Sequence, residues 1–361
     1  MKAAVFHAPN QPLTIEEIDI AKPRRNEVLI RTAFTGLCHS DLHIMEGKYP
    51  GPAPAVLGHE CAGVVEQVGE DVSYVQPGDH VITCLSVFCG HCEFCLSGHM
   101  SICNTPEVRF PPGPSKRLSW NGKPLNQILN LSGFAEHMLV HEHALVKIDR
   151  DMPLDRAALI GCAVMTGYGS IAHSAKIEPG STVAIVGCGG IGLSAINAAK
   201  IAGAARIIAV DMDPGKLELA RLFGATDGVD ASLGDVPKRV IDMTRGGVGY
   251  SFECIGLKQT AEDCFAMLRA GGTATIIGML PYGTKIELHG LDFLRERRIQ
   301  GSLMGSNRFR TDMPRLIEFY KQGRLNLDSL VAGHLPLAQI NEGFAAMKKG
   351  GLARNIIRFA A

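Results

Sequence analysis

The sequence predicts an α/β protein with two domains, one built on a doubly wound parallel sheet and the other mostly β. The chain has 361 residues, which is more than a single compact core usually holds. About the first 160 residues consist of short apolar stretches punctuated by proline and glycine, a pattern typical of strands and turns. From about residue 165, apolar strands, glycine turns and amphipathic helices alternate, which indicates repeated βαβ units.

The first part of the chain is predicted to be mostly β because it shows little helical periodicity. Its clearest strands are expected at residues 3–8, 27–36 and 62–69. The segment from Thr105 to Gly122 is rich in proline, glycine and arginine. We therefore expect an irregular surface loop there.

The parallel sheet is expected to end near residue 300, where the βαβ alternation stops. Its strands are predicted at residues 181–186, 206–211, 250–256 and 273–280, and its helices at residues 191–203, 214–224 and 258–272. The tail, with helices at 311–325 and 339–351 and a strand at 355–359, is expected to return to the first domain. The predicted domains are thus residues 1–163 together with 304–361, and residues 164–303.

Composition excludes several classes of function. The 36 basic and 36 acidic residues cancel, so no excess charge favours nucleic acid or an anionic membrane. No apolar run reaches the roughly 18 residues of a membrane span, and the N-terminus lacks the layout of a cleavable signal. We therefore expect a cytoplasmic protein. In that compartment, eleven cysteines indicate metal ligation or thiol chemistry rather than disulfides.

A glycine-rich turn carries a predicted dinucleotide site. The run Gly187-Cys-Gly189-Gly190-Ile191-Gly192 follows an apolar strand and opens a helix, whose N-terminal N–H groups can bind a pyrophosphate. Asp211 ends the next strand, where its carboxylate can bind the ribose hydroxyls of NAD and would repel the 2′-phosphate of NADP. The alternatives are a plain turn for the glycines and a helix N-cap for Asp211.

Four cysteines are crowded into one short loop. The spacing Cys89-x2-Cys92-x2-Cys95-x7-Cys103 supplies enough thiolates to close a tetrahedral zinc site without an open position, which is typical of structural zinc. An iron–sulfur cluster is the main alternative, because iron also accepts four thiolates.

Three other potential ligands, Cys38, His59 and Cys162, stand far apart in the sequence, each close to a glycine. Two thiolates and one imidazole would hold a zinc ion and leave its fourth position open for water or substrate, as a catalytic zinc requires. Any one of these residues alone would more often be an ordinary core or surface residue. Their combination predicts a catalytic metal site.

Around these residues the sequence resembles the zinc-containing alcohol dehydrogenases of the medium-chain dehydrogenase/reductase superfamily, along nearly its whole length. The stretch Gly58-His59-Glu60-x2-Gly63-x5-Gly69-x2-Val72 fits the signature of that family. The resemblance implies a GroES-like catalytic domain and a Rossmann NAD-binding domain. It also implies that Cys38, His59 and Cys162 hold the catalytic zinc, with Glu60 just behind the metal, and that hydride passes to NAD from a zinc-bound alkoxide of a primary or secondary alcohol.

The resemblance assigns roles to further residues. Ser40 and His43 would carry the alcohol proton to water, and Asp41 would support the imidazole of His59. His39 and Arg354 would contact the pyrophosphate of the cofactor, and Lys216 would contact the adenosine ribose. Thr166 would lie near the nicotinamide, and the cofactor cleft would be lined by Ile255, Ile277 and Met279. Core packing is an equal alternative for the last three, and a solvated surface is an alternative for Lys216 and Arg354. A homodimer or homotetramer is also implied.

The substrate is predicted to be a hydrophobic alcohol, because the residues matching the pocket walls of the family are Tyr49, Leu85 and Phe134. Glutathione-dependent formaldehyde dehydrogenases, a close branch, have an acid where this chain has Tyr49 and an arginine where it has Glu107. That departure argues against S-hydroxymethylglutathione. A polyol or another thiol adduct is the alternative substrate. A catalytically inactive, zinc-stabilised NAD-binding protein is disfavoured, because it would not need an acid–base pair.

Overall fold

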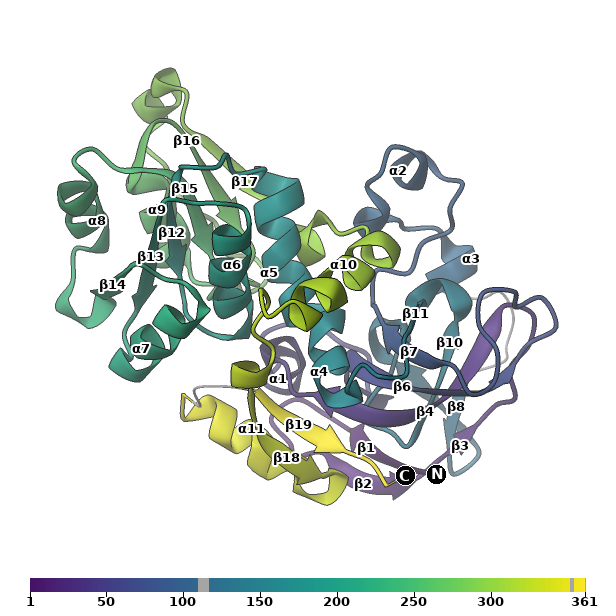
Figure 1. Cartoon of the computed structure of the whole chain (residues 1–361). Coiled ribbons are helices and arrows are strands. Elements are labelled where there is room, and N and C mark those ends of the chain that lie inside the picture. Colours follow the sequence, from purple (N-terminus) through teal and green to yellow (C-terminus); the bar gives the residue numbers. More distant parts are fainter. Residues whose placement is uncertain (110–116, 351–353, 361) are drawn as a thin grey trace. The chain divides into compact units, whose positions relative to one another are not determined.

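The computed structural model describes residues 1–109, 117–350 and 354–360, and it divides into two compact units (Figure 1). Unit 1 consists of Met1–Cys162, Arg308–Tyr320 and Leu327–Ala361. Unit 2 consists of Ala163–Asn307 and Lys321–Asn326. The last part of the chain therefore belongs to the same unit as its first part.

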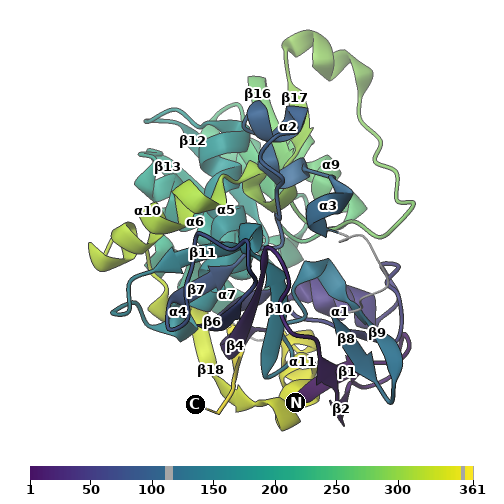
Figure 2. The same ribbon diagram turned by 90° about the vertical axis from the view of Figure 1, so that its right-hand side faces the viewer.

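Unit 1 is built on two sheets of mostly antiparallel strands (Figure 2). The first sheet has the order β2-β1-β5-β9-β8-β3, with β1 (Lys2–Phe6), β2 (Thr14–Glu17), β3 (Asp19–Ile20), β5 (Ala55–Val56), β8 (Leu118–Trp120) and β9 (Lys123–Gln127). The second has the order β11-β7-β6-β4-β19-β18, and β10 also pairs with β4. Its strands are β4 (Glu27–Gly36), β6 (Glu60–Val68), β7 (His80–Thr83), β10 (His137–His141), β11 (Leu145–Ile148), β18 (Val331–Pro336) and β19 (Arg354–Arg358).

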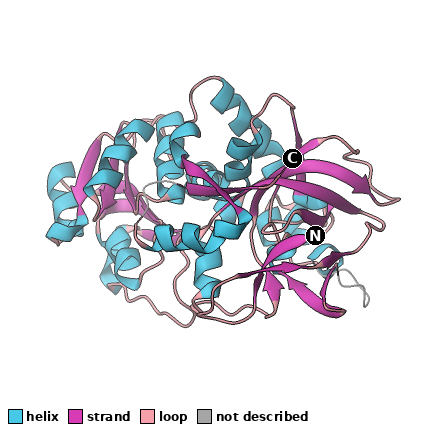
Figure 3. Ribbon diagram, turned by 90° about the horizontal axis from the view of Figure 1, so that it is seen from below, coloured by secondary structure: helices cyan, strands magenta, loops and turns pink. Residues whose placement is uncertain are grey.

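The pairing of the two longest strands of the second sheet sets the geometry of a site. Gly36 at the end of β4 lies opposite Glu60 at the start of β6. Cys38 follows β4 and His59 precedes β6, so both residues lie at the same edge of this sheet. The mostly β character predicted for this part of the chain is confirmed (Figure 3).

Short helices connect and cover the strands of unit 1. They are α1 (His39–Met45), α2 (Glu93–Leu96), α3 (Pro106–Arg109), α4 (Leu154–Leu159), α10 (Phe309–Lys321) and α11 (Ile340–Lys348). A π-helical turn over Ile160–Val164 continues α4 and carries Cys162. Among the described residues, no helix has both the length and the apolar character needed to cross a membrane.

Unit 2 is a six-stranded, all-parallel sheet with the order β14-β13-β12-β15-β16-β17. Its strands are β12 (Thr182–Val186), β13 (Arg206–Asp211), β14 (Asp227–Asp230), β15 (Val248–Glu253), β16 (Leu268–Ile276) and β17 (Arg298–Gly301). Its helices are α5 (Met165–Gly169), α6 (Gly190–Ile201), α7 (Pro214–Phe223), α8 (Val236–Thr244) and α9 (Lys258–Ala266). This order is that of a Rossmann sheet, so the predicted doubly wound α/β fold is confirmed.

Local sequence explains the start of this sheet. The four residues Val183–Val186 of β12 are buried β-branched or small apolar side chains, as expected for a strand covered on both faces. Helix α7 begins after Asp213, whose carboxylate accepts the N–H of Gly215 at 2.8 Å, with Pro214 in its first turn. It ends at Gly224, whose φ of +119° favours glycine.

Two sequence predictions need correction. The helix expected at residues 258–272 ends at Ala266, because the next residues pair with β15 as the first part of β16. The segment 105–122 is not wholly irregular, since it contains α3 and β8. Residues 110–116 of the predicted loop lie outside the described residues.

Candidate active site

Unit 1 brings together the three ligands predicted to hold a catalytic metal. One ligand atom from each of Cys38, His59 and Cys162 lies within 4.8 Å of the others. All three side chains are buried, with exposed fractions of 2%, 1% and 4%. They come from the start of α1, the start of β6 and the π-helical turn after α4.

The electrostatics of this cluster fit a cation. The hydrogen bond between Cys38 and Cys162 lowers the pKa of Cys38 well below the ordinary range and raises the pKa of Cys162 well above it. Burial by itself would lower the pKa of His59, but the charges of Asp41 and Cys38 outweigh it and raise this pKa well above its usual value. A metal ion would replace the protons that the cluster otherwise retains.

A carboxylate holds the histidine ring in place. Asp41 is fully buried, and its Oδ1 lies 3.2 Å from Nδ1 of His59. The same oxygen accepts a hydrogen bond from the N–H of Gly58 at 3.1 Å. Because Nδ1 is engaged by Asp41, Nε2 of His59 is the atom left for a metal. Two thiols, an imidazole and a supporting carboxylate fit zinc with one open position.

Glu60 and Arg354 form a second buried pair beside the cluster. Glu60 is fully enclosed, and its carboxylate occupies the space that a Cβ on Gly36 would need. Nη1 of Arg354 lies 3.9 Å from Oε2 of Glu60 and donates to the carbonyl of Leu37 at 2.6 Å. Arg354 is only 7% exposed, so its guanidinium faces Glu60 rather than a solvated chain end. Its predicted contact with pyrophosphate stays a prediction.

The first turns of α1 carry the predicted proton path. Sγ of Cys38 lies 3.7 Å from the hydroxyl oxygen of Ser40, which places Ser40 beside the cluster. His43 lies three residues after Ser40, on the same face of the helix. Burial and then the cation of Lys48 lower the pKa of His43 below its usual value. This imidazole is therefore neutral at physiological pH and available to accept a proton.

A polar hollow of about 460 Å³ adjoins His43. It is lined by His39, Leu42, His43, Glu46, Lys48, Met347 and Lys348. Glu46 pairs with Lys48 at 2.7 Å and with Lys348 at 2.6 Å. Sequence reasoning missed these three charged residues, because α11 and α1 are far apart in the chain and no local motif links them.

The four-cysteine loop closes on itself. One Sγ from each of Cys89, Cys92, Cys95 and Cys103 lies within 4.8 Å of the others. The hydroxyl of Thr105 and N–H groups of the loop overcome the effect of burial and lower the pKa of Cys89 to about 6. Four thiols, with no further ligand grouped with them among the described residues, fit a closed structural zinc site.

The glycine turn of unit 2 lies between β12 and α6. Gly187 has a φ of +95°, and a Cβ on Gly192 would overlap the carbonyl of Gly187. Gly189 is the N-cap of α6, and Gly190 and Ile191 form its first turn. The free N–H groups of this 12-residue helix suit a pyrophosphate.

Asp211 and Lys216 lie close to this turn in the fold. Oδ2 of Asp211 accepts the N–H of Cys188 at 2.8 Å, and its Oδ1 accepts that of Asp213 at 3.0 Å. The cap of α7 is Asp213, so the alternative of Asp211 as that cap is wrong. Lys216 lies half-buried in the first turns of α7.

The residues predicted near the nicotinamide all belong to unit 2. Thr166 is buried in α5 and donates to the sulfur of Met304 at 3.5 Å. Ile255 follows β15 and is 42% exposed, while Ile277 and Met279 follow β16 and are half-buried.

The predicted pocket walls occupy different surroundings. Tyr49 and Leu85 are half-buried and pack against different apolar clusters of unit 1. Phe134 is fully buried, and its ring lies edge-on to Phe344 at 5.9 Å between centroids. Glu107 on α3 is exposed and lies 3.6 Å from His91.

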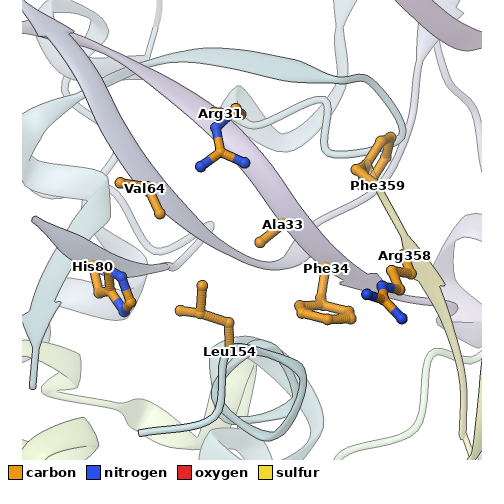
Figure 4. Close-up of a pocket in the computed structure, with 8 residues that line it drawn as sticks. All are labelled: Arg31, Ala33, Phe34, Val64, His80, Leu154, Arg358 and Phe359. Atoms are coloured by element: carbon orange, nitrogen blue, oxygen red, sulfur yellow. The ribbon is translucent and has the colours of Figure 1, made fainter. Parts of the chain in front are cut away.

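A separate hollow of about 270 Å³ lies on the second sheet of unit 1 (Figure 4). Its lining includes Arg31, Phe34, Val64, His80, Leu154 and Arg358. None of the residues predicted to act in the reaction lines it, so we place no step there.

Comparisons with known proteins agree with this geometry. Residues 24–150 match the alcohol dehydrogenase GroES-like domain, and residues 190–322 match the zinc-binding dehydrogenase family. The chain is 39% identical to an alcohol dehydrogenase class-3 of Zea mays, over 99% of this chain and 96% of the relative. It is also 39% identical to an S-(hydroxymethyl)glutathione dehydrogenase of Haemophilus influenzae, over 99% and 97%. The structure of benzyl alcohol dehydrogenase from Acinetobacter calcoaceticus, 32% identical, superposes with a TM-score of 0.93 over 99% of both chains.

Proposed function

Because this chain belongs to the zinc-containing alcohol dehydrogenase family of the medium-chain dehydrogenase/reductase superfamily, we propose that it oxidises hydrophobic primary or secondary alcohols with NAD at the cluster of Cys38, His59 and Cys162. The protein is a zinc-dependent oxidoreductase. The observation that carries the proposal is the buried set of two thiols and an imidazole, with Asp41 behind the imidazole.

The chain's own residues have distinct tasks in this reaction. Zinc at the cluster would acidify the substrate hydroxyl, and NAD bound to unit 2 would accept the hydride. Asp41 keeps Nε2 of His59 free for the metal, and burial of both thiols excludes water from their side of the cluster. The hydroxyl of Ser40 would accept the proton of the substrate hydroxyl while giving up its own, and the imidazole of His43 would receive a proton through the nicotinamide ribose on the way to solvent.

The proton path has a testable pH dependence. The neutral imidazole of His43 is the active form, so alcohol oxidation should slow as the pH falls through a pKa that lies below 6.5. His43→Ala should lower kcat/KM about tenfold at neutral pH, with a smaller deficit at alkaline pH, where hydroxide accepts the proton. A pH–rate profile measures both effects.

Lys48→Met removes a cation that lowers the pKa of His43, so the acid limb of the profile should move to higher pH. Lys348→Met is the matched control, because Lys348 also pairs with Glu46 but is not among the charges that shift His43. Equal profiles for the wild type and the Lys48 variant would contradict the assigned path.

We assign cofactor choice to Asp211. Asp211→Gly removes the carboxylate that would repel a 2′-phosphate, so the ratio of kcat/KM with NADP to that with NAD should rise about tenfold or more. Asp213→Asn is the control, because asparagine keeps the cap of α7 while removing a neighbouring charge. An unchanged ratio in the Asp211 variant would show that another residue selects the cofactor.

The substrate class rests on the apolar wall residues and on the departures at Tyr49 and Glu107. The names of the relatives favour a second candidate, S-hydroxymethylglutathione. Steady-state kinetics with NAD should compare aromatic, aliphatic, terpenoid and polyol substrates with formaldehyde plus glutathione. We expect kcat/KM for the best aromatic or aliphatic alcohol to exceed that for the glutathione adduct by about a hundredfold. The reverse order would establish the second candidate.

We also propose a cytoplasmic homodimer or homotetramer. Strand β17 is an edge of the sheet of unit 2, and the segments that precede and follow it in the chain expose large apolar side chains, among them Tyr282 (82%), Leu294 (81%) and Leu303 (56%). Pairing of this edge with a second copy of the chain would cover both the unpaired side of β17 and these apolar side chains. None of the eleven cysteines, all of which lie in the described part of the chain, forms a disulfide, which suits a reducing compartment. Sedimentation velocity gives the number of chains.

A further inference from the structure

A buried carboxylate in unit 2 organises the loop that follows β15. Glu253 is the last residue of this strand, and its side chain is fully buried. Its Oε1 accepts the N–H of Ile255 at 2.9 Å, the N–H of Gly256 at 2.8 Å and the hydroxyl of Thr260 at 2.7 Å. One charged oxygen therefore holds both the loop and the start of α9.

The main chain of Glu253 holds the loop that follows β16. Its carbonyl accepts the N–H of Ile277 at 2.9 Å and that of Gly278 at 3.0 Å. The two loops also touch each other, since a Cβ on Gly278 would overlap both the nitrogen of Gly256 and Oε2 of Glu253. Glu253 is thus the residue through which the two loops are fixed to each other.

Both loops lie where a cofactor is expected. They follow the carboxyl ends of β15 and β16, the edge at which open parallel sheets bind ligands. The side chain of Ile255 fills the space that a Cβ on Gly187 would need, so the first loop abuts the dinucleotide turn. The same loops carry three of the residues predicted to contact NAD: Ile255, Ile277 and Met279.

The choice of a carboxylate here is costly for the fold. Oε2 of Glu253 has no hydrogen-bond partner among the described residues, although it is buried. Burying a charge with an unsatisfied oxygen opposes folding. A charged acceptor, however, forms stronger hydrogen bonds than a neutral amide and therefore holds the two N–H groups of the loop more rigidly.

We propose that Glu253 is a positioning residue for the nicotinamide cofactor, because its carboxylate fixes the loop after β15, against which the loop after β16 rests, in the conformation that contacts NAD. This inference rests on the proposed function, which assigns Ile255, Ile277 and Met279 to the cofactor cleft. Loosening the loops should weaken cofactor binding and place the nicotinamide less accurately for hydride transfer. Affinity for the alcohol, which binds at residues of unit 1, should change little.

The test uses two variants and a control in the full-length, zinc-loaded protein. Glu253→Gln keeps the shape but removes the charge, and Thr260→Val removes one donor while keeping the carboxylate. Ser251→Ala is the control: Ser251 lies on the same strand, is also fully buried, and donates at 2.6 Å to the carbonyl of Cys264 in α9 rather than to either loop.

Three quantities are measured: the Kd of NADH by fluorescence titration, the isotope effect with deuterated alcohol, and the melting temperature. Glu253→Gln should weaken NADH binding about tenfold and raise the isotope effect on kcat, and Thr260→Val should weaken binding about threefold. Ser251→Ala should lower only the melting temperature.

If both loop variants bind NADH as the wild type does and show its isotope effect, with only a lowered melting temperature, the residue is merely structural and the proposal is overturned. Should Glu253→Gln fail to fold, the NADH affinity of Thr260→Val decides. The titration needs no turnover, so it tests Glu253 even if the wild type were to oxidise no alcohol and the proposed function failed.

Discussion

Replacing Cys38 by serine should reduce kcat/KM for alcohol oxidation by about three orders of magnitude or more, while NADH still binds. The substitution removes one of three ligands from a buried cluster in which no other thiol or imidazole can take its place among the described residues. Loss of the Lewis acid removes several kcal/mol of transition-state stabilisation, and each 1.4 kcal/mol corresponds to about a tenfold change in rate. Zinc content should fall from two ions per chain toward one.

The control for Cys38→Ser is Cys84→Ser. Cys84 is also fully buried in unit 1, but it belongs to neither thiol cluster, and burial raises its pKa to about 11. A serine at position 84 can form the same hydrogen bonds with the main chain and side chain of Ser86 that the thiol of Cys84 forms in the wild type. We expect two zinc ions and nearly full activity in this variant. Undiminished alcohol oxidation by the Cys38 variant would refute the mechanism.

Replacing Cys92 by serine should damage stability far more than chemistry. Sγ of Cys92 lies 3.5 Å from that of Cys95 and 3.9 Å from that of Cys103, so the four-thiol site cannot close without it. Substitutions that remove a structural metal are among the most destabilising, and we expect a loss of about 4 kcal/mol in the free energy of unfolding. Activity per catalytic zinc should stay within about threefold of the wild type.

His91→Ala is the matched control for the four-cysteine loop. His91 lies between Cys89 and Cys92 in the sequence, and its side chain forms an exposed pair with Glu107; such pairs contribute little to stability. Zinc analysis, thermal unfolding and limited proteolysis of the loop should distinguish the two variants. An unchanged zinc content in Cys92→Ser would mean that the loop holds no metal, or holds it through other ligands.

Part of this site could be predicted from local sequence patterns, in which the residues concerned lie close together in the chain. The spacing of Cys89, Cys92, Cys95 and Cys103 restricts all four thiols to one short loop, so their meeting required no knowledge of the fold. The glycine run and Asp211 are separated by a single helix and strand, and parallel pairing of β12 with β13 brings them together. Helix α7 shows where such reasoning was insufficient, because it considered Asp211 as a possible cap, whereas the backbone places Asp213 at that position.

Other residues required the fold. Phe134 matches a pocket wall of the family, which stays a prediction, and only the fold shows that it is fully buried beside Phe344 from the far end of the chain. For Arg354 the sequence predicts a contact with pyrophosphate and leaves a solvated chain end as the alternative, but only the fold shows that the guanidinium lies against Glu60. The sequence offers one signal for Glu253, an acidic residue at the end of an apolar strand, directly before Cys-Ile-Gly. Its hydrogen bonds, however, depend on the conformation of two loops.

The ligand types, the four-thiol loop, the dinucleotide turn and the α/β alternation can all be predicted without a structure, because each depends on residue type and on short spacing. Which distant residues meet depends on the folded chain. Cys38 and His59 come together through the register of β4 with β6, and Cys162 joins them because α4 packs on both strands. Such meetings depend on long-range strand pairing and burial, which no local pattern encodes.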